Sequence, residues 1–171
     1  MTSPIEIRPA KTKDVRAVRD LVDLYTPDRR LLKKNTVTLY EDVQEFYVAL
    51  SDSRVIGCGA LHVMWEDLGE VRTIAIAPDY QGQGIGGQLL EALTQRARDL
   101  GLSRLFCLTF ETDFFAKHGF APIADTPVDV TVDPTIYSEL LLSGDEGVAE
   151  FLDLERVKPN TLGNTRMLKT L

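Results

Sequence analysis

The stretch 81–87 has the composition of a loop that binds phosphate. Four of its seven residues are glycines, so backbone N–H groups there can approach a ligand with no Cβ in the way. An apolar, β-branched run over 71–77 precedes it, and apolar residues recur at helical spacing over 88–98. A helix that follows the loop adds free N–H donors and a positive dipole end. The order strand, glycine loop, helix therefore predicts a site for phosphate or pyrophosphate.

The spacing of the glycines distinguishes three kinds of phosphate loop. A P-loop ends in Gly-Lys-Ser/Thr, which this stretch lacks. Gly82, Gly84 and Gly87 match the Gly-x-Gly-x-x-Gly of a dinucleotide fold, but a turn separates them from the strand, and no second strand with a terminal acid follows. Gln81, Gly84 and Gly86 match the third pattern, Gln/Arg-x-x-Gly-x-Gly/Ala. A plain strand-to-helix turn would need fewer glycines, so this alternative is disfavoured.

Length and composition limit the classes of protein to which the chain can belong. Its 171 residues, 44% apolar and 26% charged, are ordinary for a single domain spanning 1–171. A net charge of −7 argues against nucleic acid or an anionic membrane as main partner. We expect a cytoplasmic protein, because no apolar run suits a membrane span and no signal peptide opens the chain. Cys58 and Cys107 lie in apolar runs without metal or redox spacing, so no metal site is expected.

Alternating and helical patterns predict one α/β domain around the loop. Strands are expected over 5–9, 46–50, 55–64, 71–77, 104–109 and 120–123, with a last strand at 164–168. Helices are expected after Thr12, over 36–45, along 88–98, and over 112–118, 136–142 and 147–154. The core would then span about 5–124, and 125–171 would form a C-terminal extension that completes the sheet.

Three segments resemble the GNAT acetyltransferases, namely 70–87, 105–109 and 114–120. The resemblance covers about residues 5–124 and implies the GNAT fold, a mixed central β-sheet flanked by helices. It also implies acetyl-CoA as co-substrate, with the pyrophosphate on the glycine loop and the pantetheine arm along the backbone of 74–76, which donates an N–H to the acetyl oxygen. The coenzyme-binding residues so implied are Ile74, Ala75, Ile76, Gln81, Gly82, Gln83, Gly84, Ile85, Gly86, Gly87 and Phe115.

Acetyl transfer to an amine requires that the amine lose its proton and that the thiolate leave. In the resembling enzymes a Glu at the start of the strand before the loop is the general base, and Glu70 matches that position. The alternative for Glu70 is a solvated residue at a strand start. Many members carry a Tyr that protonates the thiolate where this chain has Phe115, which has no proton to give. Phe115 is therefore expected to pack on the pantetheine, and Tyr80, Tyr47 or water to supply the proton.

Within this family the chain is similar to the acetyltransferase domain of the amino-acid N-acetyltransferases (N-acetylglutamate synthases), in a short form without the amino-acid-kinase domain. The likeness rests on 32–34, 69–71, 102–109, 115–120 and 164–166. It implies acetylation of the α-amine of L-glutamate, or of L-glutamine, as the first step of arginine biosynthesis. The absence of the kinase domain removes the usual basis for expecting feedback by arginine.

Cations and an amide are expected to hold the carboxylates of the acceptor. The substrate-binding residues expected are Lys33, Lys34, Arg72, Asn164 and Arg166. The partner is then a small-molecule amino acid, and a homodimer is compatible with the sequence. Two alternatives stay open: another small amine or a protein N-terminus as acceptor, or a non-catalytic sensor that binds acyl-CoA on the same scaffold.

Overall fold

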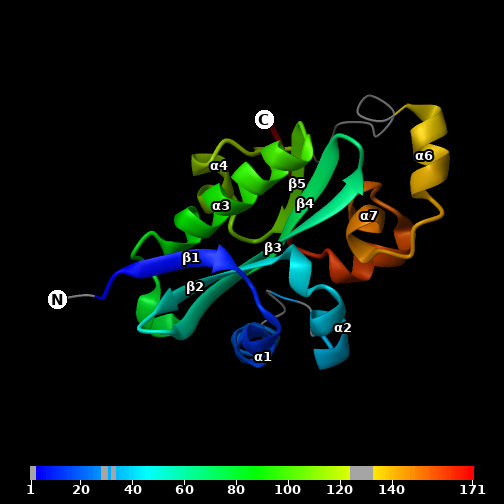
Figure 1. Ribbon diagram of the computed structural model, residues 1–171. Coiled ribbons are helices and arrows are strands. Elements are labelled where there is room, and N and C mark those ends of the chain that lie inside the picture. Colours follow the sequence, from blue (N-terminus) through cyan, green and yellow to red (C-terminus); the bar gives the residue numbers. More distant parts are fainter. Residues whose placement is uncertain (1–2, 28–30, 32–33, 124–132) are drawn as a thin grey trace. The chain divides into compact units, whose positions relative to one another are not determined.

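A computed structural model describes residues 3–27, 31, 34–123 and 133–171 (Figure 1). Within these residues a seven-stranded sheet has the order β1-β2-β3-β4-β5-β7-β6. The strands are β1 (Ile5–Pro9), β2 (Phe46–Ser51), β3 (Arg54–Trp65), β4 (Leu68–Ile76), β5 (Arg104–Thr109), β6 (Ala121–Pro122) and β7 (Thr165–Thr170). β4 and β5 pair in parallel, whereas β1 with β2, β2 with β3, β5 with β7 and β6 with β7 are antiparallel. The predicted mixed sheet is confirmed.

The helices are α1 (Val15–Asp23), α2 (Thr36–Glu41), α3 (Ile85–Leu100), α4 (Thr112–Lys117), α6 (Pro134–Leu140) and α7 (Glu146–Phe151). Short 3₁₀ turns are η1 (Thr12–Asp14), η2 (Val43–Glu45), η3 (Pro78–Tyr80) and η4 (Glu155–Asn160). The helix expected over 36–45 was too long, because α2 ends at Glu41 and η2 follows. α3 begins at Ile85, three residues earlier than the apolar spacing indicates, so the last two loop glycines lie in its first turn.

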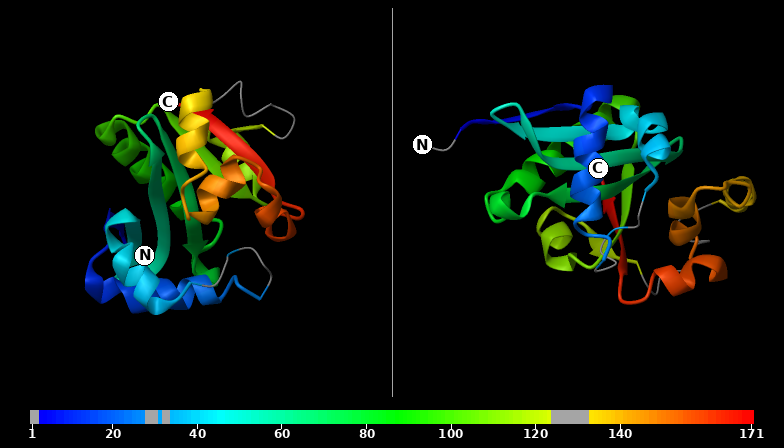
Figure 2. Two further views of the ribbon diagram at one scale, coloured as in Figure 1. Left: turned by 90° about the vertical axis from the view of Figure 1, so that its right-hand side faces the viewer. Right: turned by 90° about the horizontal axis from the view of Figure 1, so that it is seen from below.

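The chain forms two compact units, one of residues 1–62 and 71–100 and the other of 63–70 and 101–171. In the first unit, α3 lies on one face of β1–β3 and α1 on the other (Figure 1 and Figure 2). Two strand glycines let α3 come close. A Cβ at Gly57 would lie 3.2 Å from Leu89 Cδ1, and one at Gly59 would lie 3.1 Å from Leu93 Cδ1. This packing fixes the helix that follows the glycine loop.

The second unit has a core of its own, which joins strand residues to α6 and α7. Its buried members are Met64, Leu68, Phe106, Leu140, Val148, Phe151 and Leu152. Phe106 of β5 and Phe151 of α7 meet edge to face, with ring centroids 5.3 Å apart. β7 pairs along all six residues of β5 and separates it from β6. The C-terminal segment therefore contributes both a strand and the helices that cover Phe106.

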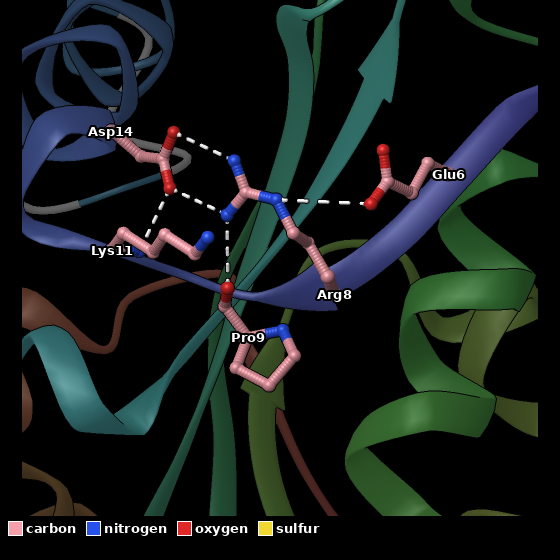
Figure 3. Close-up of polar contacts among 5 residues, drawn as sticks. All are labelled: Glu6, Arg8, Pro9, Lys11 and Asp14. Carbon is pink, nitrogen blue, oxygen red and sulfur yellow. Dashed lines mark hydrogen bonds and ion pairs between the residues drawn. The ribbon is translucent and has the colours of Figure 1, made fainter.

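A partly buried ion pair fixes the entry to α1 in the first unit (Figure 3). Arg8 Nη1 donates to Asp14 Oδ2 at 2.8 Å, and Nη2 donates to Oδ1 at 3.2 Å. The backbone N–H of Lys11 donates to the same Oδ2 at 2.7 Å. Asp14 is 4% exposed. The hydrogen bond from Arg8, assisted by that from Lys11, holds the pKa of Asp14 below its ordinary 3.8, although burial opposes this.

Asp14→Asn is expected to lower the free energy of unfolding at pH 7 by about 2 kcal/mol, because the charged hydrogen bonds from Arg8 are lost. Since the folded-state pKa is depressed, the contribution is present above the unfolded-state value and is lost as the pH falls through the folded-state value. Urea unfolding of both proteins across an acid pH series should show the difference closing at low pH. Asp20→Asn, in an exposed pair with Arg19, is the control and should change little. A constant difference would contradict the assignment.

Candidate functional site

The glycine loop has the backbone that its composition predicts. Gly82 and Gly84 have φ values of +74° and +79°, in the left-handed region that favours glycine. A Cβ at either position would meet no atom within 4 Å, so the backbone conformation, rather than lack of space, requires glycine. The stretch 81–84 is exposed, and the buried side chain of Ile85 anchors the start of α3. An exposed glycine loop at the start of a 16-residue helix is an arrangement that binds anions.

Tyr25, which follows α1 in a turn, connects β4 to the loop. Its hydroxyl donates to the carbonyl oxygen of Ile76, the last residue of β4, and accepts from Gln81 Nε2 at 2.6 Å. The N–H of Ala77 donates to Ile56 O of β3 at 2.8 Å. In a strand, the backbone N–H and C=O groups of successive residues point to opposite edges. Because the N–H of Ala77 points to β3, the backbone groups of Ile76 point away from β3. The Tyr25 hydroxyl therefore links the end of β4 to Gln81, the first residue of the loop.

Tyr25→Phe is expected to raise KM for a coenzyme held by the loop by about tenfold, because two hydrogen bonds that align the loop are lost while the ring stays. kcat should change little. Steady-state kinetics with varied coenzyme concentration measures both constants. Tyr40→Phe is a matched control, since Tyr40 is 40% exposed on α2. Equal KM values for Tyr25→Phe and the wild type would show that the hydroxyl does not position the loop.

Thr73 has an unusual backbone in the middle of β4. Its φ is +61°, which is rare for a β-branched residue, and it is 7% exposed. Its carbonyl oxygen accepts a hydrogen bond from Cys58 Sγ at 3.5 Å. Outliers of this kind gather at functional sites, where the surrounding structure maintains them. Thr73 directly precedes the backbone of 74–76, which by the family resemblance is expected to bind the pantetheine arm, and nothing in the residue type predicts its conformation.

Arg72, an expected substrate ligand, contacts a carboxylate of its own unit. Arg72 Nη2 lies 3.4 Å from Glu45 Oε1, and His62 Nδ1 lies 2.8 Å from Glu45 Oε2. The three side chains are at most 25% exposed. Sequence reasoning missed Glu45, which lies in η2 and carries no motif. Arg72 therefore presents its positive charge together with a neighbouring negative charge.

Glu70 lies inside β4 in the second unit and is 4% exposed. The alternative of a solvated residue at a strand start is therefore wrong, because β4 begins two residues earlier, at Leu68. Glu70 is opposite Phe106 in the parallel pairing with β5. Burial and then the charge of Glu70 raise the pKa of the Cys107 thiol. A buried carboxylate is costly and needs compensation, which makes Glu70 a candidate for chemistry.

Arg166 in β7 contacts α7 through its guanidinium. Nε donates to the carbonyl oxygen of Glu150 at 2.9 Å, and Nη2 donates to that of Phe151. Burial lowers the pKa of this guanidinium. Asn164 precedes β7, and its N–H donates to Thr161 O at 3.0 Å. The Arg166 guanidinium thus donates two hydrogen bonds to the last turn of α7, a role that the sequence did not predict.

Three expected site residues remain, namely Lys33, Lys34 and Phe115. Lys34 is half-buried just before α2, and Lys33 lies outside the described residues. Phe115 in α4 is 6% exposed and packs edge to face against Phe114 and Phe120, each with ring centroids 5.1 Å away. The ring is thus part of an aromatic cluster.

Neither a metal site nor a membrane-spanning helix occurs in the part of the chain that the structure describes. There, no three His, Cys, Asp or Glu side chains gather in a way that could hold a metal ion. None of the described helices has the length and apolar character needed to cross a membrane.

Comparison with known proteins identifies the family. The Acetyltransferase (GNAT) family model matches residues 15–120, which include β4, the glycine loop and α3. The chain belongs to the GNAT acetyltransferase family. The predicted GNAT fold is confirmed, and so is acetyl-CoA as the co-substrate of this acyltransferase.

Two relatives show how this GNAT chain compares in length. The amino-acid acetyltransferase of Mycobacterium tuberculosis is 55% identical over 168 residues, which are 96% of this chain and 94% of the relative. The amino-acid acetyltransferase of Ralstonia nicotianae is 37% identical over 127 residues, which are 72% of this chain and 28% of the relative. The predicted similarity to the amino-acid N-acetyltransferases is confirmed, and the mycobacterial relative matches the short form.

Solved structures agree with this placement in the GNAT family. A Mycobacterium tuberculosis protein in complex with CoA and NLQ has a TM-score of 0.90 and 54% identity, covering 97% of this chain and 99% of that one. N-acetylglutamate synthase from Neisseria gonorrhoeae, in complex with coenzyme A and N-acetyl-glutamate, has a TM-score of 0.76 and 23% identity. It covers 100% of this chain and 36% of that one, and at this identity it shows the fold alone.

Proposed function

We propose that the chain transfers the acetyl group of acetyl-CoA to the α-amine of L-glutamate or L-glutamine, the first step of arginine biosynthesis. The observation that carries the proposal is 55% identity, over 96% of the chain, to a protein named amino-acid acetyltransferase. The buried carboxylate in β4 and the glycine loop before α3 supply the base and the coenzyme site that such a reaction needs.

In this proposal the loop N–H groups over 81–87 bind the pyrophosphate, and the backbone of Ile74, Ala75 and Ile76 binds the pantetheine arm. Glu70 takes the proton of the amine, directly or through one water. The amine nitrogen then attacks the thioester carbonyl carbon, whose oxygen accepts an N–H from β4. The C–S bond breaks, and the CoA thiolate takes up a proton. Phe115 packs and does not supply that proton, which leaves Tyr80, Tyr47 or water.

The carboxylates of the acceptor bind to Lys33, Lys34, Arg72, Asn164 and Arg166 in this proposal. Arg72 lies beside Glu45, and Arg166 holds carbonyls of α7. Arg72 and Arg166 therefore attract an incoming carboxylate less strongly than an isolated cation would. In this proposal the two lysines supply the larger share of the attraction. Next to the negative charge of Glu45, a neutral side-chain amide fits better than a second carboxylate. This supports glutamine as an acceptor in addition to glutamate.

A thiol-release assay with acetyl-CoA and each standard amino acid tests the proposal. Glutamate or glutamine should raise the rate of CoA release far above the rate without acceptor, and mass spectrometry should find the N-acetyl amino acid. A peptide with a free N-terminus and a simple alkyl amine serve as competing acceptors. The proposal fails if neither amino acid raises the rate, and a preference for the peptide would favour the protein N-terminus instead.

A further inference from the structure

Gly147 is a position where glycine is required by a neighbour and not by the backbone. It is buried in the first turn of α7, and its φ lies outside the left-handed region, so alanine could adopt the same conformation. A Cβ there would nevertheless lie 1.7 Å from Glu70 Oε2 and 2.7 Å from Glu70 Cδ. Alanine is the better residue within a helix by about 1 kcal/mol, so a glycine here has a packing reason. That reason is the carboxylate of Glu70.

α7 is held in place on both sides of this contact. The side chain of Asp145 caps the helix by accepting from the N–H of Val148 at 3.1 Å. At the other end, Arg166 donates to the carbonyls of Glu150 and Phe151. Phe151 is 1% exposed and packs on Phe106. The helix therefore cannot easily move away from Glu70, because a shift would disrupt its cap, its last turn and its aromatic contact.

The backbone of Glu70 is fixed as well. Leu68, Gly69 and Glu70 pair in parallel with Arg104, Leu105 and Phe106 of β5, and Phe106 is also the ring on which α7 packs. With both backbones held, only the side-chain torsions of Glu70 can place its carboxylate, and the first turn of α7 limits them. Asp145 Oδ2 would lie 3.0 Å from the same Cβ, so a second carboxylate borders the space.

We propose that Gly147 is a positioning residue, which keeps the first turn of α7 free of a side chain so that the Glu70 carboxylate is held at its reactive position. The inference rests on the proposed function, in which Glu70 takes the amine proton. It assigns a role to α7, in which the sequence analysis found no motif. A base displaced by about 1 Å can lose on the order of a hundredfold in rate, so this contact bears on kcat.

Gly147→Ala tests the proposal, because the atom that must yield is the end of a flexible side chain and the fold should persist. We expect kcat to fall by about tenfold to a hundredfold, with KM for acetyl-CoA unchanged, as the carboxylate moves. The melting temperature should stay close to that of the wild type. Gly144→Ala is the matched control, since a Cβ at Gly144 meets no atom within 4 Å. Wild-type kcat for Gly147→Ala would overturn the proposal.

The same substitution in the E70D background shows whether the effect acts through Glu70. The shorter side chain of E70D keeps its carboxylate away from the new methyl group, so Gly147→Ala should then change kcat little relative to E70D alone. An equal loss of kcat in both backgrounds would overturn the proposal, because it would show a general effect on α7.

Crystal structures of the wild type and of Gly147→Ala give a readout that needs no activity. A displaced Glu70 carboxylate supports the contact, and an unmoved carboxylate overturns it. If neither glutamate nor glutamine is acetylated by the wild type, the proposed function fails, while these structures still decide how Gly147 places the carboxylate.

Discussion

Glu70→Gln is expected to lower kcat by about 10²- to 10⁴-fold near neutral pH, the range for loss of a positioned general base. The amide has the same shape and fits a side chain that is 4% exposed, but it cannot take a proton from the amine. The loss should shrink as the pH rises, because a growing fraction of the acceptor amine is then already unprotonated. Steady-state rates across a pH series at saturating acetyl-CoA measure this dependence.

Two comparisons separate this effect from a general loss of charge or fold. KM for acetyl-CoA should be unchanged, because the glycine loop does not depend on the carboxylate. Glu66→Gln removes an exposed carboxylate four residues earlier and should leave kcat as in the wild type. A pH profile for Glu70→Gln that runs parallel to that of the wild type would remove Glu70 as the base.

Gly84→Val is expected to raise KM for acetyl-CoA by about a hundredfold. At φ +79° a β-branched residue is strained, so the loop must rearrange and turn its N–H groups away from the pyrophosphate. Each hydrogen bond to a charged group contributes about 1.5–3 kcal/mol, and the loss of one or two gives this magnitude. Kinetics with varied acetyl-CoA, together with calorimetric titration of CoA, measures the change.

Gly101→Val is the control for backbone strain. Gly101 has φ +91° just after α3, and a Cβ there also meets no atom within 4 Å. This variant should lose stability by about as much as Gly84→Val while keeping the KM of the wild type. If both variants raise KM for acetyl-CoA equally, backbone strain in general causes the effect, and coenzyme binding does not depend on the loop.

The glycine loop could be predicted from the sequence because its information is local. Closely spaced glycines between a strand and a helix require left-handed backbone, and Gly82 and Gly84 have it. The amphipathic pattern after them likewise fixed α3 to within a few residues. The β-branched run before them indicated β4, although the positive φ of Thr73 left no trace in the residue type.

The parts that position the site could not be predicted, because their partners lie far apart in the sequence. Tyr25 reaches Ile76 across 51 positions, and Gly147 meets a carboxylate that belongs to β4. Arg166 was recognisable as a cation, but its partners are main-chain carbonyls of α7, which have no sequence signature. Such contacts result from packing over the whole fold, and only a structure shows them.

A crystal structure with bound CoA shows whether the glycine loop holds the coenzyme. We expect pyrophosphate oxygens within hydrogen-bonding distance of the N–H groups over 81–87, at the start of α3, with the left-handed glycine backbone kept. A coenzyme bound elsewhere, with this loop unoccupied, would show that the loop is not the coenzyme site.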